Sequence, residues 1–369
     1  MTLEPLVATD GRAVPDVKPA GPVRDDAGIE FSGAAVKNQA LLLQRARMTR
    51  AIGVPERGRV LLENALKSGG WKKPKLWWEL VAFVSRPEHY ARIRALWLSS
   101  PTACHRNASI LRAVARAAAV TGNHDEARAL LRKLILLVSS GPVAEGRARG
   151  TDGEAGDAGE FSTNAVEALV DLDRAFSGIG LRFFLISGTL LGKVRDNKII
   201  GWDKDIDVGY FVEECSVDLE QYFVGAGRFR IGRVDLTSDR LRVIHDNGMW
   251  IDVFPHYMED NKRWHDGTAT RWWNTPFELK TTDFLGIQQY VPDNPELYLD
   301  ENYGDWRTPN PFFDARIDAP NAEVTDPEHF VSLLYFGLEG SIRAGKDVMR
   351  RRYIDLLREQ GEGDWLNRV

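Results

Sequence analysis

The sequence predicts an α+β protein in which an all-helical region precedes a domain built on a mixed sheet. Three observations lead to this prediction. Apolar residues recur at steps of three and four between residues 36 and 140, as they do on one side of a helix. Residues 141–159 are rich in glycine and lack large apolar residues, which is typical of a linker. At 183–211, a strand, a glycine turn that opens a short helix, and a second strand follow one another.

The composition is that of a globular protein with more than one domain. At 369 residues the chain is long enough for two or three domains and a sizeable core. Its net charge of −5 provides no basic footprint for nucleic acid. The two cysteines, Cys104 and Cys215, support neither a disulfide framework nor a cysteine zinc site. The sequence has no signal-peptide pattern and no apolar run of about 18 residues, so we expect a cytoplasmic protein without a transmembrane segment.

The first 140 residues divide into a leader and a helical region. Residues 1–35 are rich in Pro, Gly, Asp and Ala without a period, which predicts disorder. Residues 36–140 predict several helices, and the segment Ala113–Ile135 resembles a tetratricopeptide-type unit. Two interpretations of this helical-repeat-like region remain open. It is either a docking surface for a protein partner or polymer acceptor, or a helical cap that stabilises the following domain.

The predicted domain at 160–322 begins with a helix, a buried strand and a small-residue turn. Ser187, Gly188 and Thr189 form that turn, and a helix is expected from Leu190. Backbone N–H groups and the positive end of a helix dipole make such a turn a cradle for phosphate. Arg195 follows about two helical turns later, where a guanidinium can hold a phosphate through two bonds. An exposed arginine would be the simpler interpretation if the acids described next were not so close in sequence.

Two aspartates on the next strand predict a metal site. Asp205 and Asp207 are two residues apart, so in an extended segment both carboxylates point to one face. Ionised carboxylates repel one another unless a cation joins them, and oxygen ligands suit Mg²⁺ or Mn²⁺ better than zinc. Asp203 shares this face if the strand begins early enough. Trp202 is expected to pack under the strand or to form the floor of a donor pocket.

A third acid is expected on the strand that follows a hairpin. Asn247-Gly248 is a strong signal for a two-residue hairpin loop. With that loop, His245 pairs with Trp250 and Val243 pairs with Asp252, so that His245 and Asp252 share one face. Asp252 is the one carboxylate in an apolar strand, and its burial is costly without a partner, which favours a role as ligand. His245 is a candidate base or phosphate donor group by register alone.

The motif at 188–209, followed by the segment at 251–257, resembles the LicD/fukutin family of phosphotransferases within the nucleotidyltransferase-fold superfamily. The resemblance extends over about 160–322. Lys204 departs from the family pattern because it replaces an acid, and Gly201 departs from it because it replaces a proline. The matching positions are Gly188, Thr189, Gly192, Arg195, Trp202, Asp203, Asp205, Asp207 and Asp252.

The resemblance implies a nucleotidyltransferase-like mixed β-sheet with flanking helices and a phosphotransferase activity. The implied reaction moves phosphocholine, ribitol phosphate or glycerol phosphate from a CDP-activated donor to a hydroxyl of a glycan or lipid-linked sugar. Asp205 and Asp207 would hold Mg²⁺ or Mn²⁺ on the donor diphosphate, and Asp252 would bridge a second metal ion or take the proton from the acceptor hydroxyl. Arg195 would act in catalysis, by neutralising phosphate charge together with the helix start at Gly188 and Thr189. The residues expected to bind substrate are Gly188, Thr189, Gly192, Trp202 and Asp203.

Residues 323–369 predict amphipathic helices. Arg350–Arg352 could contact an anionic polymer or a membrane surface, although a solvated helix face is the favoured interpretation. Two other functions remain open for the whole chain: a metal-dependent glycosyltransferase that uses a nucleotide-sugar, and a non-catalytic adaptor. The nucleotide released during turnover distinguishes the three.

Overall fold

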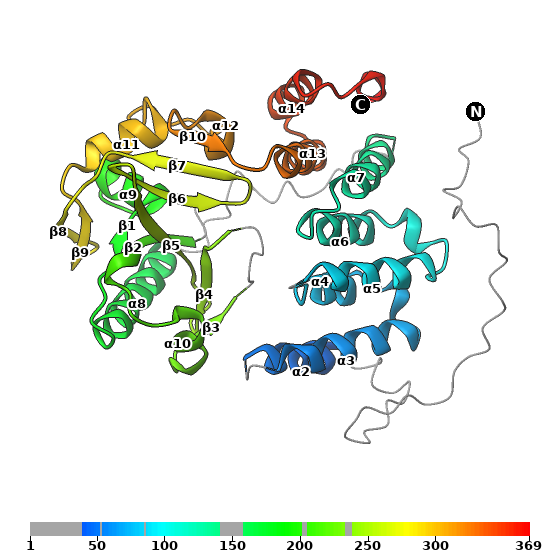
Figure 1. Ribbon diagram of the computed structural model, residues 1–369, viewed down its shortest axis with the longest axis horizontal. Helices are drawn as coiled ribbons and strands as arrows, with labels where there is room; N and C mark the ends of the chain where they lie inside the picture. The colour runs from blue at the N-terminus through cyan, green and yellow to red at the C-terminus, as the bar shows by residue number, and fades with distance from the viewer. Residues whose placement is uncertain (1–38, 52–53, 85, 141–157, 201–204, 233–237) are drawn as a thin grey trace.

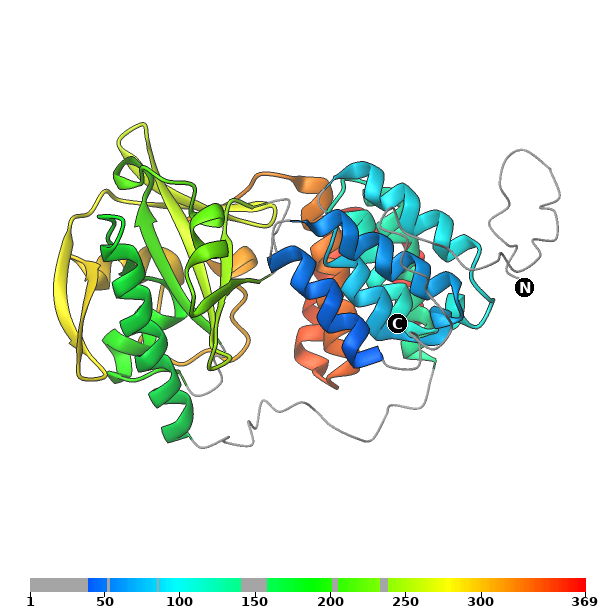
Figure 2. The same cartoon turned by 90° about the horizontal axis from the view of Figure 1, so that it is seen from below.

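The computed structural model describes residues 39–51, 54–84, 86–140, 158–200, 205–232 and 238–369. The predicted leader, and all but the end of the predicted linker, lie outside these residues. So do Trp202 and Asp203. Within the described part the chain forms a helical body and a sheet domain (Figures 1 and 2), and the α+β prediction is confirmed.

The N-terminal helices bury part of the predicted apolar pattern: Leu62, Ala65 and Leu66 of α3 are buried, whereas Leu41 of α2 is exposed. The alanine-rich helix α6 packs closely on α7, and both contribute to one hydrophobic core. The Asn107 side chain begins α6 by accepting the N–H groups of Ser109 and Ile110 at 3.0 and 3.1 Å. A tetratricopeptide character remains a prediction. The helices are α2 (Gln39–Ala51), α3 (Pro55–Lys67), α4 (Pro74–Val81), α5 (Pro87–Leu98), α6 (Ala108–Ala119) and α7 (His124–Ser139).

The C-terminal helices α13 (Pro327–Arg343) and α14 (Asp347–Glu359) share the core of the N-terminal helices. Figure 1 shows α13 beside α7, from which it is distant in sequence. Arg132 of α7 bonds both the Tyr335 hydroxyl, at 2.7 Å, and Glu362, at 2.6 Å. We call α2–α7, α13 and α14 together the helical body. Arg352, in the basic cluster of α14, pairs with Asp318, so part of that cluster is used within the protein.

The sheet domain is a mixed sheet with the strand order β10-β7-β6-β5-β2-β1-β9-β8. Strand β2 is parallel to β5, and β1 is parallel to β9, whereas the other pairs are antiparallel. Strand β4 pairs with the first half of the long strand β5, and β6 pairs with its second half. The strands are β1 (Phe184–Leu185), β2 (Asp205–Phe211), β3 (Phe229–Ile231), β4 (Leu241–His245), β5 (Trp250–Glu259), β6 (Lys262–Gly267), β7 (Thr270–Asn274), β8 (Leu279–Phe284), β9 (Ile287–Pro292) and β10 (Ala322–Val324).

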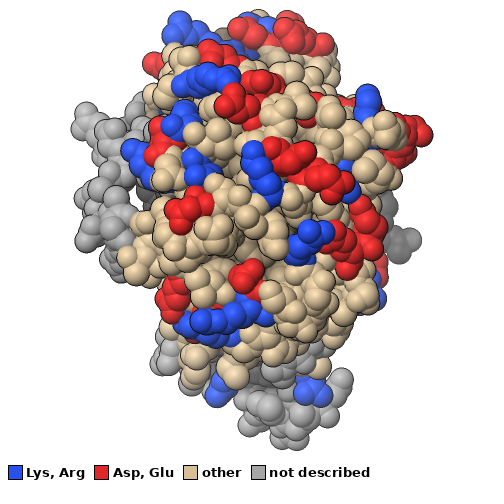
Figure 3. All heavy atoms as spheres, turned by 90° about the vertical axis from the view of Figure 1, so that its left-hand side faces the viewer, with Lys and Arg blue, Asp and Glu red and all other residues tan. Residues whose placement is uncertain are grey.

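Helices pack on the sheet, and α8 packs against its apolar face. Helix α8 carries Ala165, Leu169, Leu172 and Phe176 into the core of the domain, as their spacing predicted. On the face shown in Figure 3, acidic and basic side chains alternate without a block of one sign. No helix in the described ranges is long and apolar enough to cross a membrane. The helices of this domain are α8 (Ala158–Ser177), α9 (Ser187–Asp196), α10 (Leu219–Gly225), α11 (Pro295–Tyr303) and α12 (Ala315–Asp318).

The hairpin between β4 and β5 differs from the prediction by one residue. The His245 N–H donates to the Met249 carbonyl oxygen at 2.8 Å, which leaves three residues in the loop instead of two. Gly248 has a φ of +93°, and the Asn247 side chain accepts the Met249 N–H at 3.0 Å; both favour the longer loop. The predicted register is therefore wrong, and Arg242, not Val243, lies opposite Asp252.

Candidate active site

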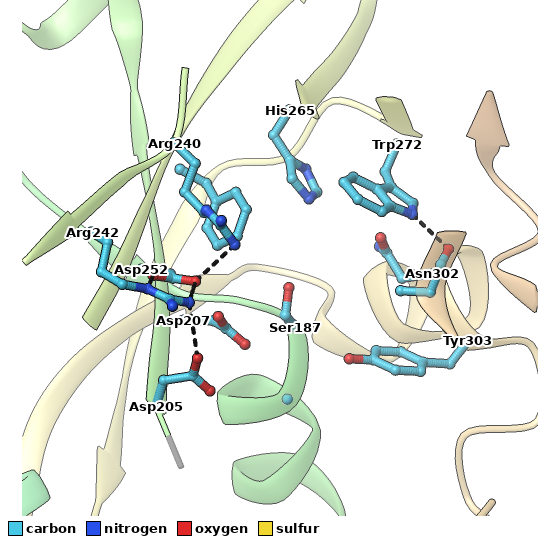
Figure 4. A pocket seen from close by; sticks show the side chains of 13 residues that line it. Ser187, Asp205, Asp207, Arg240, Arg242, Asp252, His265, Trp272, Asn302 and Tyr303 are labelled. Carbon is cyan, nitrogen blue, oxygen red and sulfur yellow. Dashed lines mark hydrogen bonds and ion pairs between the residues drawn. The ribbon is translucent and has the colours of Figure 1, made fainter. Parts of the chain in front are cut away.

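A cavity of about 320 Å³ opens where β2 and β5 begin, beside the first turn of α9 (Figure 4). Strands β4 and β5 form one wall, and the β6–β7 hairpin with α11 and α12 forms the opposite wall. We call it the acidic pocket. Its described lining consists of Ser187, Gly188, Asp205, Asp207, Arg240, Arg242, Asp252, Phe254, His265, Trp272, Asn302, Tyr303 and Ala315.

The parallel pairing of β2 with β5 brings three acids together. Asp207 lies directly beside Asp252, and Asp205 lies two positions earlier on the same face of β2. Between the two aspartates of β2, Ile206 points to the opposite face and is fully buried in the core. The alternation of acid and apolar residues therefore aims all three carboxylates at one cavity while it anchors the strand.

Two arginines of the β4 segment hold these acids. Arg242 forms two bonds to Asp252, and its Nη2 lies 3.3 Å from Asp205 Oδ2. Arg240 Nη1 donates to Asp252 Oδ2 at 2.9 Å. Both oxygens of Asp252, a residue only 2% exposed, are thus bonded to guanidinium groups. A buried carboxylate needs such partners because the loss of water is otherwise uncompensated.

The electrostatics of Arg242 show how strongly the pocket concentrates negative charge. Burial pulls the pKa of Arg242 down, but its bonds to Asp252 and the charges of Asp205 and Asp207 outweigh burial. The net result is a pKa above the usual value for arginine, so the guanidinium stays charged. Three carboxylates acting on one cation indicate a site that attracts further positive charge.

The shifted register removes His245 from this site. His245 is 1% exposed on the other side of the sheet, where its Nε2 lies 3.1 Å from Asp171 of α8 and its ring packs against Phe229. The expectation that His245 faces the acids is wrong, because the three-residue loop turns every residue of β4 to the opposite face. Arg240 and Arg242 take that place. The sequence feature that could have predicted this is the spacing of two residues between Arg240 and Arg242, which places both side chains on one face of the strand before β5.

The small-residue turn borders the pocket as expected, but its residues differ in what they do. Ser187 has a φ of +47° and lines the cavity with Gly188 at the start of α9. Thr189 is buried, and its hydroxyl accepts the Asp207 N–H at 2.9 Å, which ties the helix to β2. At Gly192 a Cβ atom would lie 2.4 Å from the Lys198 carbonyl oxygen, so glycine is required there for packing.

Arg195 does not line the pocket. It lies in the last turn of α9, where its Nε bonds the neighbouring Asp196 at 3.0 Å. Seven residues of helix separate it from Gly188, a rise of roughly 10 Å. The structure therefore places Arg195 at the far end of the helix whose first turn borders the cavity.

The wall opposite the acids is aromatic and uncharged. His265 is 3% exposed and stacks between His256, at 4.6 Å, and Trp272, at 5.3 Å. Burial lowers the pKa of His265 to about 3, so its imidazole is neutral near pH 7. Trp272 Nε1 donates to the Ala315 carbonyl oxygen at 2.9 Å, which joins the β6–β7 hairpin to α12. Sequence patterns gave no sign that these residues meet the acids.

Known proteins with similar sequences match this part of the chain. Residues 180–294 match the family described as LicD/FKTN/FKRP, nucleotidyltransferase domain. The ribitol-5-phosphate transferase FKTN of Mus musculus is 31% identical over 177 residues, which cover 45% of this chain and 38% of that protein. The FKTN of Homo sapiens is 30% identical over 173 residues, 44% of this chain and 37% of that protein.

A second relative is more distant. The ribitol 5-phosphate transferase FKRP of Mus musculus is 26% identical over 145 residues, which cover 36% of this chain and 29% of that protein. In each of these three comparisons the match spans less than two fifths of the relative's length. Residues 180–294 form a LicD/fukutin-type domain, which confirms the resemblance that the motif suggested.

Proposed function

We propose that this chain, through its LicD/fukutin-type domain, transfers a phosphate-linked group from an activated donor to a hydroxyl of a glycan. The relatives named above are ribitol-5-phosphate transferases, which supports this class of reaction. The observation that carries the proposal is the acidic pocket. It combines three carboxylates, two arginines and the first turn of a helix around one cavity.

The charges of the pocket suit a metal-bound diphosphate. Its described lining has three aspartates against two arginines, and His265 adds no charge near neutral pH. A donor diphosphate brings further negative charge, which this lining cannot balance alone. Asp205 and Asp207 are hard oxygen donors on one face of β2, so a divalent cation such as Mg²⁺ or Mn²⁺ fits them.

We assign Asp252 as the third acid of the set, with Arg240 and Arg242 as its partners. When bound, the cation would neutralise the donor phosphates and stabilise charge on the leaving group. The guanidinium groups that now bond Asp252 present N–H donors suited to phosphate oxygens. The N–H groups at Ser187 and Gly188 add the positive end of α9.

The proposed roles of the residues outside this cluster follow from their positions. The aromatic wall of Trp272 and Tyr303 would take the sugar ring of the acceptor, since aromatic faces pack well against C–H surfaces. Thr189 and Gly192 would act indirectly, by holding α9 and β2 together. Trp202 and Asp203 remain predicted substrate-binding residues. The catalytic role of Arg195 also remains a prediction, although Arg195 lies at the far end of α9.

The donor that we propose is a CDP-activated alcohol, and the released nucleotide tests it. Purified protein with Mg²⁺ and a glycan acceptor should release CMP from one of CDP-choline, CDP-ribitol or CDP-glycerol. The matched control is Asp205→Asn, which keeps the side-chain shape and removes the charge. Release of UDP or GDP from a nucleotide-sugar would favour a glycosyltransferase instead. Absence of metal-dependent turnover with every donor would favour a non-catalytic adaptor.

A further inference from the structure

Two histidines and one aspartate lie together where α7 and α13 begin, outside the acidic pocket. His124 is the first residue of α7, Asp326 directly precedes α13, and His329 is the third residue of α13. Each side chain offers one nitrogen or carboxylate oxygen, and these three atoms lie within 4.8 Å of one another. We call the three residues the histidine cluster.

Contacts within the protein hold the two helix starts together. Helix α13 packs on α7 in the core of the helical body (Figure 1). Arg128, one turn after His124, bonds Glu328 of α13 at 2.5 Å, although the two residues are 200 positions apart in sequence. The rings of His124 and His329 lie 5.1 Å apart, centre to centre. The histidine cluster is therefore formed by the fold itself, before any ligand binds.

Asp326 uses one carboxylate oxygen to begin α13 and presents the other to the cluster. Its Oδ1 accepts the His329 N–H at 3.0 Å, as an N-cap residue does. Its Oδ2 lies 3.8 Å from His124 Nε2. Among the described residues, no lysine or arginine pairs with Asp326. Its negative charge is therefore available to a cation.

The ring of His124 makes no hydrogen bond to any described residue. Its Nδ1 is buried without a partner, and its Nε2 is too far from Asp326 Oδ2 for a hydrogen bond. The side chain is only 12% exposed, and His329 is only 2% exposed. Buried polar atoms are almost always bonded, so an imidazole of this kind indicates a ligand for it.

The chemistry of the donor set favours one class of ion. Two imidazoles and a carboxylate suit Zn²⁺, whereas Mg²⁺ and Ca²⁺ prefer oxygen ligands alone. Ligand atoms of a tetrahedral Zn²⁺ site are about 3.3 Å apart, since each bond is about 2.0 to 2.1 Å long. The 3.8 Å between His124 Nε2 and Asp326 Oδ2 is close to this spacing. The Asp326 side chain is 47% exposed, so it can move inward and it leaves a path from solvent.

We propose that the histidine cluster binds one Zn²⁺ ion, which fastens the start of α13 to the start of α7. Three protein ligands leave the fourth position of the ion to water. Asp125 and Glu328, in the first turns of the two helices, offset the positive helix ends that would otherwise disfavour a cation. The site is structural and separate from the cation proposed for the acidic pocket, whose described lining contains none of these residues.

Calorimetric titration of the chelator-treated full chain with zinc chloride tests the site. Use of the double variant Asp205→Asn with Asp207→Asn removes the acidic pocket as a competing site. We expect one Zn²⁺ per chain, and no binding of Mg²⁺ at the same concentration. His124→Gln in this background should weaken Zn²⁺ binding by more than about a hundredfold, because loss of a ligand's outer partner alone costs about tenfold to a hundredfold.

A second variant and a control guard against effects on folding. Asp326→Asn keeps a side chain that can cap α13 but removes the charge, and it should weaken Zn²⁺ binding by about tenfold or more. The matched control is His105→Gln, the same substitution in the helical body at a histidine that bonds the Trp97 carbonyl oxygen outside the cluster. It should bind Zn²⁺ as its parent does. No Zn²⁺ binding by the double variant, or equal affinity with and without His124→Gln, overturns the inference.

Hydrogen exchange tests whether the ion fastens the two helices. Zn²⁺ should slow amide exchange in the first turns of α7 and α13 and raise the melting temperature, because it binds the folded chain. Neither effect should occur in His124→Gln, whose melting transition without Zn²⁺ shows that it is folded. Slower exchange elsewhere but not at these two helix starts would place the ion at another site and would sink the proposal.

Discussion

The acidic pocket has a counterpart in a cavity lined by Trp78, Arg112, Arg116, Arg316 and Phe336, which we call the arginine cavity. The two differ in how the chain assembles them. The acids of the pocket come from two neighbouring parallel strands, and the turn beside them follows β1 directly. The arginine cavity collects Trp78, Arg316 and Phe336, which are more than 200 residues apart in sequence at the extremes. Short motifs therefore specify the first site, whereas only the docking of the helical body against the sheet domain creates the second.

The largest expected effect tests whether the acidic pocket is the site of chemistry. Asp207→Asn should lower nucleotide release by about a thousandfold or more, because it removes charge stabilisation at the reacting phosphates. Arg116→Glu, which lies outside the acidic pocket, should leave nucleotide release unchanged. Nucleotide release under saturating Mg²⁺ measures both. A loss of the same size in both variants would erase the distinction between the two cavities.

A second prediction concerns the stability of the acid cluster. Arg242→Ala should lower the free energy of unfolding by about 3 kcal/mol, because it leaves the buried Asp252 with a single cationic partner. Arg240→Ala removes one bond to Asp252 instead of two and should cost about 1 kcal/mol. Urea unfolding of both variants gives the comparison. Equal costs would show that Arg242 is not the main partner of Asp252.

The aromatic wall of the acidic pocket predicts a dependence of stability on pH. His265 has a folded-state pKa of about 3, well below the unfolded value, so acid favours the unfolded chain. Stability due to this group is complete above about pH 6.5 and falls as the pH drops toward 3, by about 2 kcal/mol at pH 5. His265→Phe should flatten this part of the curve. An unchanged slope between pH 6.5 and 5 would contradict the prediction.

The smallest effect is expected in the helical body. Tyr335→Phe removes the hydroxyl that bonds Arg132 and Glu362, and it should lower the free energy of unfolding by about 1 kcal/mol. Nucleotide release should not change. Thermal and urea unfolding measure the loss. The matched control is Tyr222→Phe in the sheet domain, which likewise removes a tyrosine hydroxyl, one that donates to the Ala175 carbonyl oxygen at 2.8 Å. An effect of Tyr335→Phe on nucleotide release alone would connect the helical body to catalysis directly.

Local sequence patterns predicted the elements that meet at the acidic pocket. The alternation around Asp205 and Asp207 predicted a strand with one acidic face, and the small-residue turn predicted the start of α9. These inferences succeeded because side-chain period and turn chemistry act within a few residues. The order of strands and the parallel pairing of β2 with β5 have no such local signal.

The register of β4 could not be predicted in the same way. Loops of two and three residues both accommodate Asn-Gly. In the folded protein Asn247 also bonds Asn164 and Glu167 of α8, and such contacts leave no local signal in the sequence. The length of the loop decided whether His245 or Arg242 faced the acids. The packing of α13 on α7 was equally invisible, since residues far apart in sequence leave no trace in a local pattern.

The shared core of the first and last helices has a consequence for how the protein is made. About 190 residues separate the end of α7 from the start of α13. At ordinary rates of translation the ribosome needs roughly ten to forty seconds to cover that distance. Throughout that interval α13, which covers the apolar side of α7 in the folded protein, has not been synthesised. We therefore expect the nascent chain to depend on chaperones until synthesis is nearly complete.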